Sequence, residues 1–253
     1  MTDVRLMAFD LDDTLAASKT AIDPKMAEIL VELLDYVEVC VISGGQFGQF
    51  QSQLVDQLPA DAADKLPRLH LMPTCGTQYY IYDGGWQQQY AENLTEDQKQ
   101  RALAAVEDNA RRLGLWESET WGPILEDRGS QITFSALGQA APVDAKKAWD
   151  PTGEKKESLR AAVADLLPDL EVRSGGSTSV DITRRGIDKA YGMKKLAQLT
   201  GIDLDHMLFV GDRLDEGGND YPVKALGVDC HAVEGWEDTA SFVARFIADR
   251  AKG

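Results

Sequence analysis

Cysteines, basic side chains and long apolar runs are all scarce in this sequence of 253 residues. The three cysteines, Cys40, Cys75 and Cys230, are odd in number and widely spaced, which argues against a disulfide scaffold or a zinc site. No apolar run approaches the roughly 20 residues that cross a bilayer, and the first residues lack the pattern of a signal peptide. We therefore expect a cytoplasmic protein with reduced thiols and no membrane partner.

Basic side chains are outnumbered, with 26 lysines and arginines against 42 aspartates and glutamates and a formal net charge of −16. Because nucleic-acid backbones bind to basic surfaces, this imbalance argues against a nucleic-acid partner. A small anionic substrate would need a local source of positive charge. The length allows one large domain or two modest ones.

The two ends of the chain carry the strand and helix pattern of a parallel sheet. A buried strand is predicted over 4–11 and another over 37–42, with a helix between them that begins after Asp23-Pro24. The pattern returns near the C-terminus, with a helix over 188–199 and strands over 206–211 and 228–232. In such folds the functional loops follow the carboxyl ends of the strands.

The middle of the chain has a different order of predicted helices and strands. A hairpin is predicted over 79–90, and then helices over 95–113 and 154–167 alternate with strands over 131–137 and 177–183. This order lacks the regular strand–helix–strand repeat and indicates an α+β insertion. We therefore predict an α/β fold with a doubly wound parallel-sheet core of residues 1–85 and 187–253, interrupted by an α+β cap of residues 86–186.

The first candidate catalytic motif is Asp10-Leu11-Asp12-Asp13-Thr14, directly after the first strand. Carboxylates crowded into one loop repel each other and favour a divalent cation, and Mg²⁺ is the ion that prefers oxygen ligands and phosphate. Asp10 could attack phosphorus, and Asp12 could protonate the leaving oxygen and later activate water. An acidic loop or a helix cap without catalytic function is the alternative.

Three further motifs follow along the chain. Ser43 and Gly44 come after the second strand and could bind phosphate oxygens, although an ordinary turn would look the same. Lys189 could neutralise phosphate, or it could be a solvated helix lysine. Asp212 follows the strand over 206–211 and could complete a metal site, with Asn219 and Asp220 orienting its ligands, unless the loop is a plain acidic turn.

The order of these four motifs resembles the haloacid dehalogenase superfamily, and the whole chain is most similar to its eukaryotic-type phosphomannomutase family. The matching segments include Gly217-Gly218-Asn219-Asp220, Cys75-Gly76-Thr77 and Asp188-Lys189-Ala190-Tyr191. The resemblance implies that Asp10, Asp212 and the main-chain carbonyl of Asp12 bind Mg²⁺. It also implies that Ser43, Gly44 and Lys189 bind phosphate.

The resemblance extends to the cap, where it implies that Arg128, Ser179 and Asp181 contact the substrate and that a homodimer could form. Other family arginine positions are occupied here by Lys19, Trp121 and Gln139, and Asp13 stands where the family usually has glycine. A mutase must hold a sugar bisphosphate at both ends, and arginine is the side chain best suited to the distal phosphate.

These departures favour hydrolysis over isomerisation. The sequence predicts a Mg²⁺-dependent phosphatase that acts through an aspartyl-phosphate on a phosphosugar or a similar small phosphorylated metabolite. A phosphomannomutase that interconverts hexose 1- and 6-phosphates is the close alternative. A metabolite-binding protein without catalytic activity is the third hypothesis.

Overall fold

The computed structural model describes residues 3–252 and divides into two compact units. The core consists of Met1–Ala91 with Asp188–Gly253, and the cap consists of Glu92–Ile187. The cap was expected to begin at residue 86, but the strand Trp86–Ala91 belongs to the core. It pairs with the preceding strand of the core sheet, and these hydrogen bonds hold it there.

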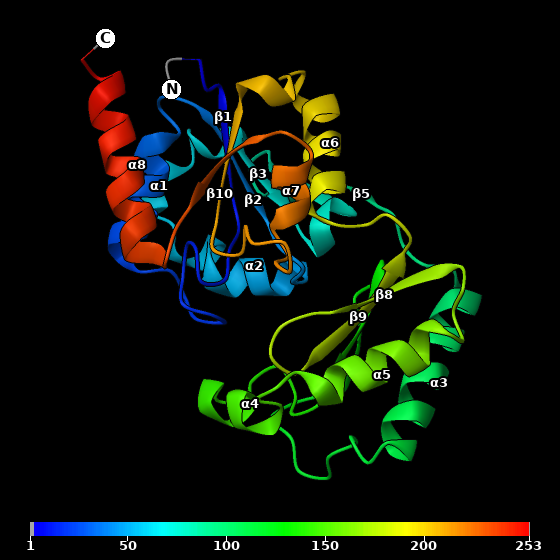
Figure 1. Ribbon diagram of the computed structural model, residues 1–253. Coiled ribbons are helices and arrows are strands. Elements are labelled where there is room, and N and C mark those ends of the chain that lie inside the picture. Colours follow the sequence, from blue (N-terminus) through cyan, green and yellow to red (C-terminus); the bar gives the residue numbers. More distant parts are fainter. Residues whose placement is uncertain (1–2, 253) are drawn as a thin grey trace. The chain divides into compact units, whose positions relative to one another are not determined.

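The core is built on a seven-stranded sheet in the order β11-β10-β1-β2-β3-β4-β5 (Figure 1). Strands β11, β10, β1, β2 and β3 are parallel, and β4 and β5 form an antiparallel hairpin at one edge. Their bounds are β1 (Leu6–Phe9), β2 (Glu38–Ile42), β3 (Leu69–Met72), β4 (Gln78–Tyr82), β5 (Trp86–Ala91), β10 (Met207–Gly211) and β11 (Asp229–Ala232). The predicted doubly wound α/β core is confirmed.

Helices cover both faces of this sheet. Figure 1 shows α1 and α8 on one face and α6 and α7 on the other, and each face has its own apolar cluster. The helices are α1 (Pro24–Leu33), α2 (Phe47–Gln53), α6 (Lys189–Thr200), α7 (Tyr221–Ala225) and α8 (Trp236–Arg250). As predicted, Asp23 caps α1, because its carboxylate accepts from the Lys25 main-chain N–H at 2.9 Å. Short 3-10 turns occupy Val55–Gln57, Ala60–Ala62, Leu66–Arg68, Thr74–Gly76 and Leu204–His206.

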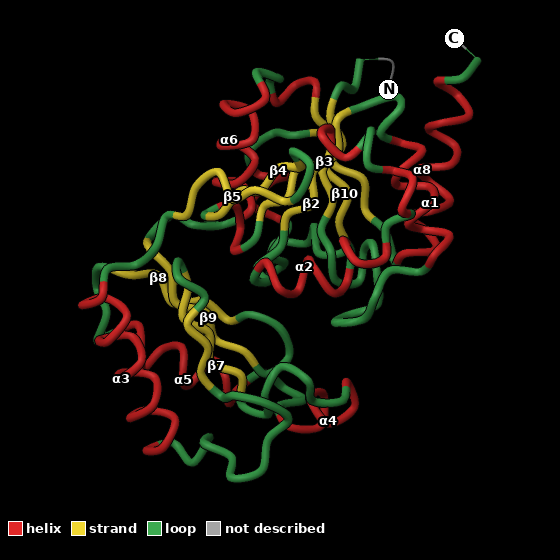
Figure 2. Tube along the Cα trace, turned by 180° about the vertical axis from the view of Figure 1, so that it is seen from behind, coloured by secondary structure: helices red, strands yellow, loops and turns green. Residues whose placement is uncertain are grey.

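The cap is an α+β unit with an antiparallel sheet in the order β6-β7-β9-β8. Its strands are β6 (Leu125–Asp127), β7 (Gln131–Ser135), β8 (Leu170–Ser174) and β9 (Ser179–Arg184), and its helices are α3 (Glu96–Arg112), α4 (Val143–Trp149) and α5 (Glu154–Ala164). Figure 2 shows α3 and α5 on one side of this sheet. The apolar side chains of β7 and β9 (Ile132, Phe134, Val180 and Ile182) belong to the same buried cluster as residues of these helices.

Within residues 3–252, none of the helices combines the length and the apolar character that crossing a membrane requires.

Candidate active site

Three of the predicted site residues follow neighbouring parallel strands. Asp10 comes after β1, Ser43 after β2 and Asp212 after β10. Phe9 of β1 is in register with Val41 of β2 and with Val210 of β10, so all three strands end at the same edge of the sheet. These polar side chains, which follow separate strands in the sequence, therefore lie together at the carboxyl edge of the core sheet.

Lys189 lies buried between two aspartates at this edge. Its Nζ is 2.7 Å from Asp10 Oδ1 and 2.5 Å from Asp220 Oδ1, and its side chain is only 1% exposed. Asp188 caps α6 by accepting from the Tyr191 main-chain N–H, so Lys189 is the first residue of that helix. The alternative of a solvated helix lysine is therefore wrong.

Asp220 was expected to orient the metal ligands, with its own role at the metal site left open, and its contact with Lys189 was not predicted. It is fully buried and bonds Lys189 through Oδ1, while its Oδ2 accepts from the Arg213 main-chain N–H at 3.1 Å. Gly211 makes room for it, because a Cβ there would lie 2.4 Å from Asp220 Oδ2. The glycines in this loop were the signal that some side chain approaches the backbone closely.

Asp10, Asp212 and Asp220 form a cluster in which one carboxylate oxygen from each residue lies within 4.8 Å of those of the other two. When all three are ionised, they and the Lys189 ammonium carry two excess negative charges, which is the charge that a divalent cation neutralises. Oxygen ligands from carboxylates are those that Mg²⁺ prefers. The residues present therefore fit a bound Mg²⁺.

The electrostatics of the cluster show the same excess of negative charge. Burial and the nearby carboxylate of Asp220 raise the pKa of Asp10 to about 7, although the Lys189 ammonium acts in the opposite direction. Burial and Asp220 also raise the pKa of Asp212. Burial would lower the pKa of Lys189, but its two carboxylate partners outweigh burial and raise it, so the ammonium stays charged.

Asp12 has different partners and does not join the cluster through its side chain. Its carboxylate accepts from Lys19 Nζ at 2.6 Å, from Gln49 Nε2 at 3.0 Å and from Gln53 Nε2 at 3.2 Å. Burial opposes ionisation here, but Lys19 outweighs it and lowers the pKa of Asp12. The expectation for Asp12 as a metal ligand concerned its main-chain carbonyl and stays a prediction. The next residue, Asp13, has a φ of 59°, in the left-handed region that favours the glycine usual in the family.

Ser43 and Gly44 form the turn after β2. Ser43 is buried, and its Oγ accepts from the Gly45 main-chain N–H at 3.2 Å. Gly44 is half-buried, and a Cβ there would meet nothing within 4 Å. A hydroxyl and an uncrowded stretch of backbone therefore stand at the carboxyl edge, as binding of phosphate oxygens would require.

Within the cap, Arg128 is neutralised by a neighbour. Its Nη2 lies 2.5 Å from Glu126 Oε2, and both side chains are largely shielded from solvent. The only cap arginine that the family resemblance assigns to the substrate is thus held in a charge-assisted pair.

A row of hydrogen-bonding side chains runs along one face of β7 and β9. Thr133 and Asp181 are register partners, as are Ser135 and Ser179. Asp181 Oδ1 accepts from Thr133 Oγ1 at 2.8 Å and from Gln131 Nε2 at 2.9 Å, and Gln139 Nε2 donates to Ser135 Oγ at 2.5 Å. We call these six residues the polar row: Gln131, Thr133, Ser135, Gln139, Ser179 and Asp181. None of these six residues is cationic, but Arg173 of β8 is the register partner of Asp181 and lies 3.6 Å from Glu171 through its Nε.

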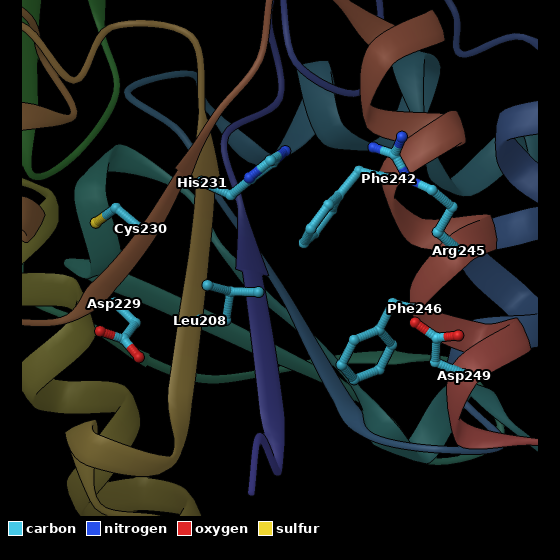
Figure 3. Close-up of a pocket in the computed structure, with 8 residues that line it drawn as sticks. All are labelled: Leu208, Asp229, Cys230, His231, Phe242, Arg245, Phe246 and Asp249. Carbon is cyan, nitrogen blue, oxygen red and sulfur yellow. The ribbon is translucent and has the colours of Figure 1, made fainter. Parts of the chain in front are cut away.

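A separate cavity of about 460 Å³ lies between β10, β11 and α8 (Figure 3). Leu208, Phe242 and Phe246 give it an apolar wall, and Arg245 and Asp249 stand on the helix side. Leu208 is the second residue of β10, whereas the carboxylate cluster follows the last residue of that strand. This cavity therefore does not include the predicted catalytic residues.

Comparisons with known proteins show the family of this chain. Residues 26–248 match the family model of eukaryotic phosphomannomutase. A probable phosphomannomutase of Caenorhabditis elegans is 26% identical over 259 residues, which cover 96% of each chain. Relatives of this kind identify the chain as an enzyme, of phosphatase or phosphomannomutase type, and the hypothesis of a protein without catalytic activity is not retained.

Solved structures show the same fold. IMP-nucleotidase of Plasmodium falciparum superposes with a TM-score of 0.73 at 14% identity and covers 99% of this chain and 70% of its own. A haloacid dehalogenase-like hydrolase from Bacteroides thetaiotaomicron gives a TM-score of 0.64 at 15% identity and covers 96% and 99%. The chain belongs to the eukaryotic phosphomannomutase family.

Proposed function

We propose that this enzyme is a Mg²⁺-dependent phosphatase that hydrolyses a phosphosugar or a similar small phosphate ester. The observation that carries the proposal is the buried assembly of Asp10, Lys189 and Asp220 beside Asp212. It supplies a carboxylate nucleophile, a fixed ammonium and a set of oxygens for a divalent cation in one small volume. Such preorganised charge is the main source of catalysis in phosphoryl transfer.

The first half of the reaction forms a bond between an Asp10 oxygen and phosphorus while the bond from phosphorus to the substrate oxygen breaks. Lys189, Ser43 and the main chain at Gly44 bind the phosphoryl oxygens, and Asp12 gives a proton to the departing oxygen. Asp10, Asp212 and the carbonyl of Asp12 would hold Mg²⁺, which would supply positive charge that offsets the charge of the phosphoryl group. Asp220 holds Lys189 in place.

The second half releases inorganic phosphate. Asp12 takes a proton from water as the water oxygen bonds to phosphorus and the bond to Asp10 breaks. Asp10 is then a free carboxylate again, and Asp12 is ready to protonate the next leaving group. No second phosphate is needed in this cycle.

The cap favours water over a second sugar hydroxyl as the acceptor. The distal phosphate of a bisphosphate carries about two negative charges, and its binding requires cationic side chains such as arginine. The polar row offers amides, hydroxyls and one carboxylate. Arg128 is paired with Glu126, and the neighbouring Arg173 lies near Glu171. We propose that Ser179 and Asp181 bind hydroxyl groups of an uncharged leaving group and that Arg128 supports them.

Phosphomannomutase activity is the second candidate, because the family match and the identity to the Caenorhabditis elegans relative extend over most of the chain. Solved structures of the same fold bear other names, among them IMP-nucleotidase of Plasmodium falciparum and a trehalose-6-phosphate phosphatase related protein.

One incubation separates the two candidates. The enzyme with Mg²⁺ is given mannose 1-phosphate, glucose 1-phosphate and the corresponding 6-phosphates, each with and without a hexose 1,6-bisphosphate. We expect free phosphate to be released at a rate that the bisphosphate does not increase. Bisphosphate-dependent conversion of 1-phosphates to 6-phosphates would instead establish a mutase.

A variant sharpens this comparison. Gln139→Arg adds a cation to the polar row at a position where the family usually has arginine. We expect the variant to bind the hexose bisphosphate more tightly than the parent enzyme does, by roughly tenfold if one charge-assisted pair forms. Lys194→Arg, at an exposed position in the core, is the control.

A further inference from the structure

The carboxylate of Asp12 is held by more hydrogen bonds than its acid and base role alone would require. Its Oδ1 accepts from the main-chain N–H of Lys19 at 2.8 Å and from Gln53 Nε2 at 3.2 Å. Its Oδ2 accepts from Lys19 Nζ at 2.6 Å and from Gln49 Nε2 at 3.0 Å. A carboxylate has about four lone-pair sites, so these donors occupy all of them.

The two oxygens are held in different ways. The donors to Oδ1 are a backbone amide and the amide of Gln53, which is 3% exposed and also donates to the carbonyl of Thr20 at 2.7 Å. The backbone amide cannot withdraw unless the chain itself moves, and the Gln53 amide is held in place by its burial and by its second hydrogen bond. The donors to Oδ2 are the ends of two flexible side chains, and that of Lys19 is 34% exposed. Oδ2 can therefore be released by rotation of side chains alone.

The sequence of α2 builds this arrangement. Gln49 and Gln53 are four residues apart and so lie on the same side of the helix. Gln49 also accepts from Lys19 Nζ at 2.9 Å through its Oε1, so that these two side chains hold each other as well as Asp12. Gly45 leaves room for the Gln49 amide, because a Cβ at this position would lie 2.2 Å from Gln49 Oε1.

We infer that Gln53 is a positioning residue, which together with the Lys19 N–H anchors Asp12 through Oδ1, and that Oδ2 is the oxygen that transfers protons. The inference rests on the proposed function, because it assumes that Asp12 is the acid and base. Lys19 Nζ and Gln49 release Oδ2 for each transfer. The Oδ2 proton goes to the substrate oxygen as its bond to phosphorus breaks, and Oδ2 regains a proton from the water that attacks phosphorus.

The test uses two substrates of similar shape that differ in their need for a proton. Phenyl phosphate has a more basic leaving group than 4-nitrophenyl phosphate and so depends more on a general acid. The rate of the first turnover is measured for each, as release of the phenol from enzyme saturated with Mg²⁺. The test variant is Gln53→Leu, in which the lost Oε1 had no hydrogen-bond partner. The matched control is Gln51→Leu on the same helix, where the side chain contacts Asp56 and not Asp12.

We expect Gln53→Leu to lower the first-turnover rate with phenyl phosphate by about tenfold to a hundredfold. The first-turnover rate with 4-nitrophenyl phosphate should change by less than about threefold. Gln51→Leu should change neither rate. The retained reaction with 4-nitrophenyl phosphate also shows that the variant is folded. Equal slowing of both substrates, or no slowing of either, would overturn the positioning role. The absence of a first-turnover release from either substrate in the unmodified enzyme would instead overturn the proposed function.

Discussion

Replacement of Lys189 by methionine removes the ammonium that lies between Asp10 and Asp220. Methionine has a similar length and apolar volume, so the change deletes a charge with little change in packing. All three groups are shielded from water, with side-chain exposures of 1% for Lys189, 6% for Asp10 and 0% for Asp220. The two carboxylates would then be buried without their shared partner.

The size of the expected loss of stability follows from this burial. Breaking a buried ion pair by removing one partner costs about 3–5 kcal/mol, because the remaining charge has neither water nor a counterion. We therefore expect Lys189→Met to lower the free energy of unfolding by about that amount in the presence of EDTA, which keeps Mg²⁺ from the cluster. Phosphatase activity should be lost as well.

The pH dependence of this loss has a definite sign. The Lys189 ammonium lowers the pKa of Asp10, which burial has raised to about 7, so its removal raises that pKa further. A carboxyl whose pKa is raised on folding binds more protons in the folded state, and stability is lost as pH rises through the window between the unfolded and folded values. The unmodified enzyme should lose stability in this way up to about pH 7, whereas the variant should continue to lose up to about 1.4 kcal/mol for each pH unit above about pH 7.

The assay is urea denaturation, monitored by circular dichroism, at several pH values between about pH 5 and about pH 9. Lys194→Met is the matched control, because Lys194 lies on the same helix and is exposed. The reasoning would be refuted by a Lys189→Met variant as stable as the control at pH 7, or by one that becomes more stable as the pH rises.

Other predictions concern close packing and the metal. Gly192→Ala should destabilise the core by about 1–3 kcal/mol, since a Cβ there would lie 2.2 Å from Ile42 Cδ1 and the neighbouring chain must shift. Gly48→Ala on α2 meets nothing within 4 Å and should be neutral or stabilise by up to about 1 kcal/mol, and urea denaturation of both variants checks the contrast. Mg²⁺ at about a hundred times its Kd should add about 2.7 kcal/mol of stability, seen as a rise in Tm. Asp212→Asn should remove most of that rise, and an unchanged rise would exclude Asp212 as a ligand.

Much of the core could be predicted because the relevant signals are local. The apolar runs that form β1, β2 and β10 each end directly at a polar residue, and parallel strands bring such ends to one edge. Asp10 and Asp212 could be placed on this basis. The residues of β5 could not be assigned to the core, because a polar hairpin strand has the same sequence pattern whether it belongs to the core or to the cap.

The contacts in the site that the sequence did not predict join residues that are distant in sequence. Asp220 is 31 residues from Lys189, and its approach depends on a loop that folds back over Gly211. Gln49 and Gln53 are 37 and 41 residues from Asp12, and only their helical spacing hinted at a shared partner. The alternation of residues 131–137 predicted a strand with one buried face. The pairing of Thr133 with Asp181, however, follows from the register of β7 and β9.

Phosphorylation of Asp10 is the event on which the whole account rests, and it can be measured directly. Enzyme mixed with Mg²⁺ and 4-nitrophenyl phosphate is quenched in acid during the first turnover and treated with borohydride, which reduces an acyl-phosphate to the alcohol. Mass spectrometry of the peptide that contains Asp10 should then show homoserine at this residue, and none in Asp10→Asn, which should also lack turnover. Release of phosphate without modification of Asp10, or wild-type rates in Asp10→Asn, would contradict the mechanism.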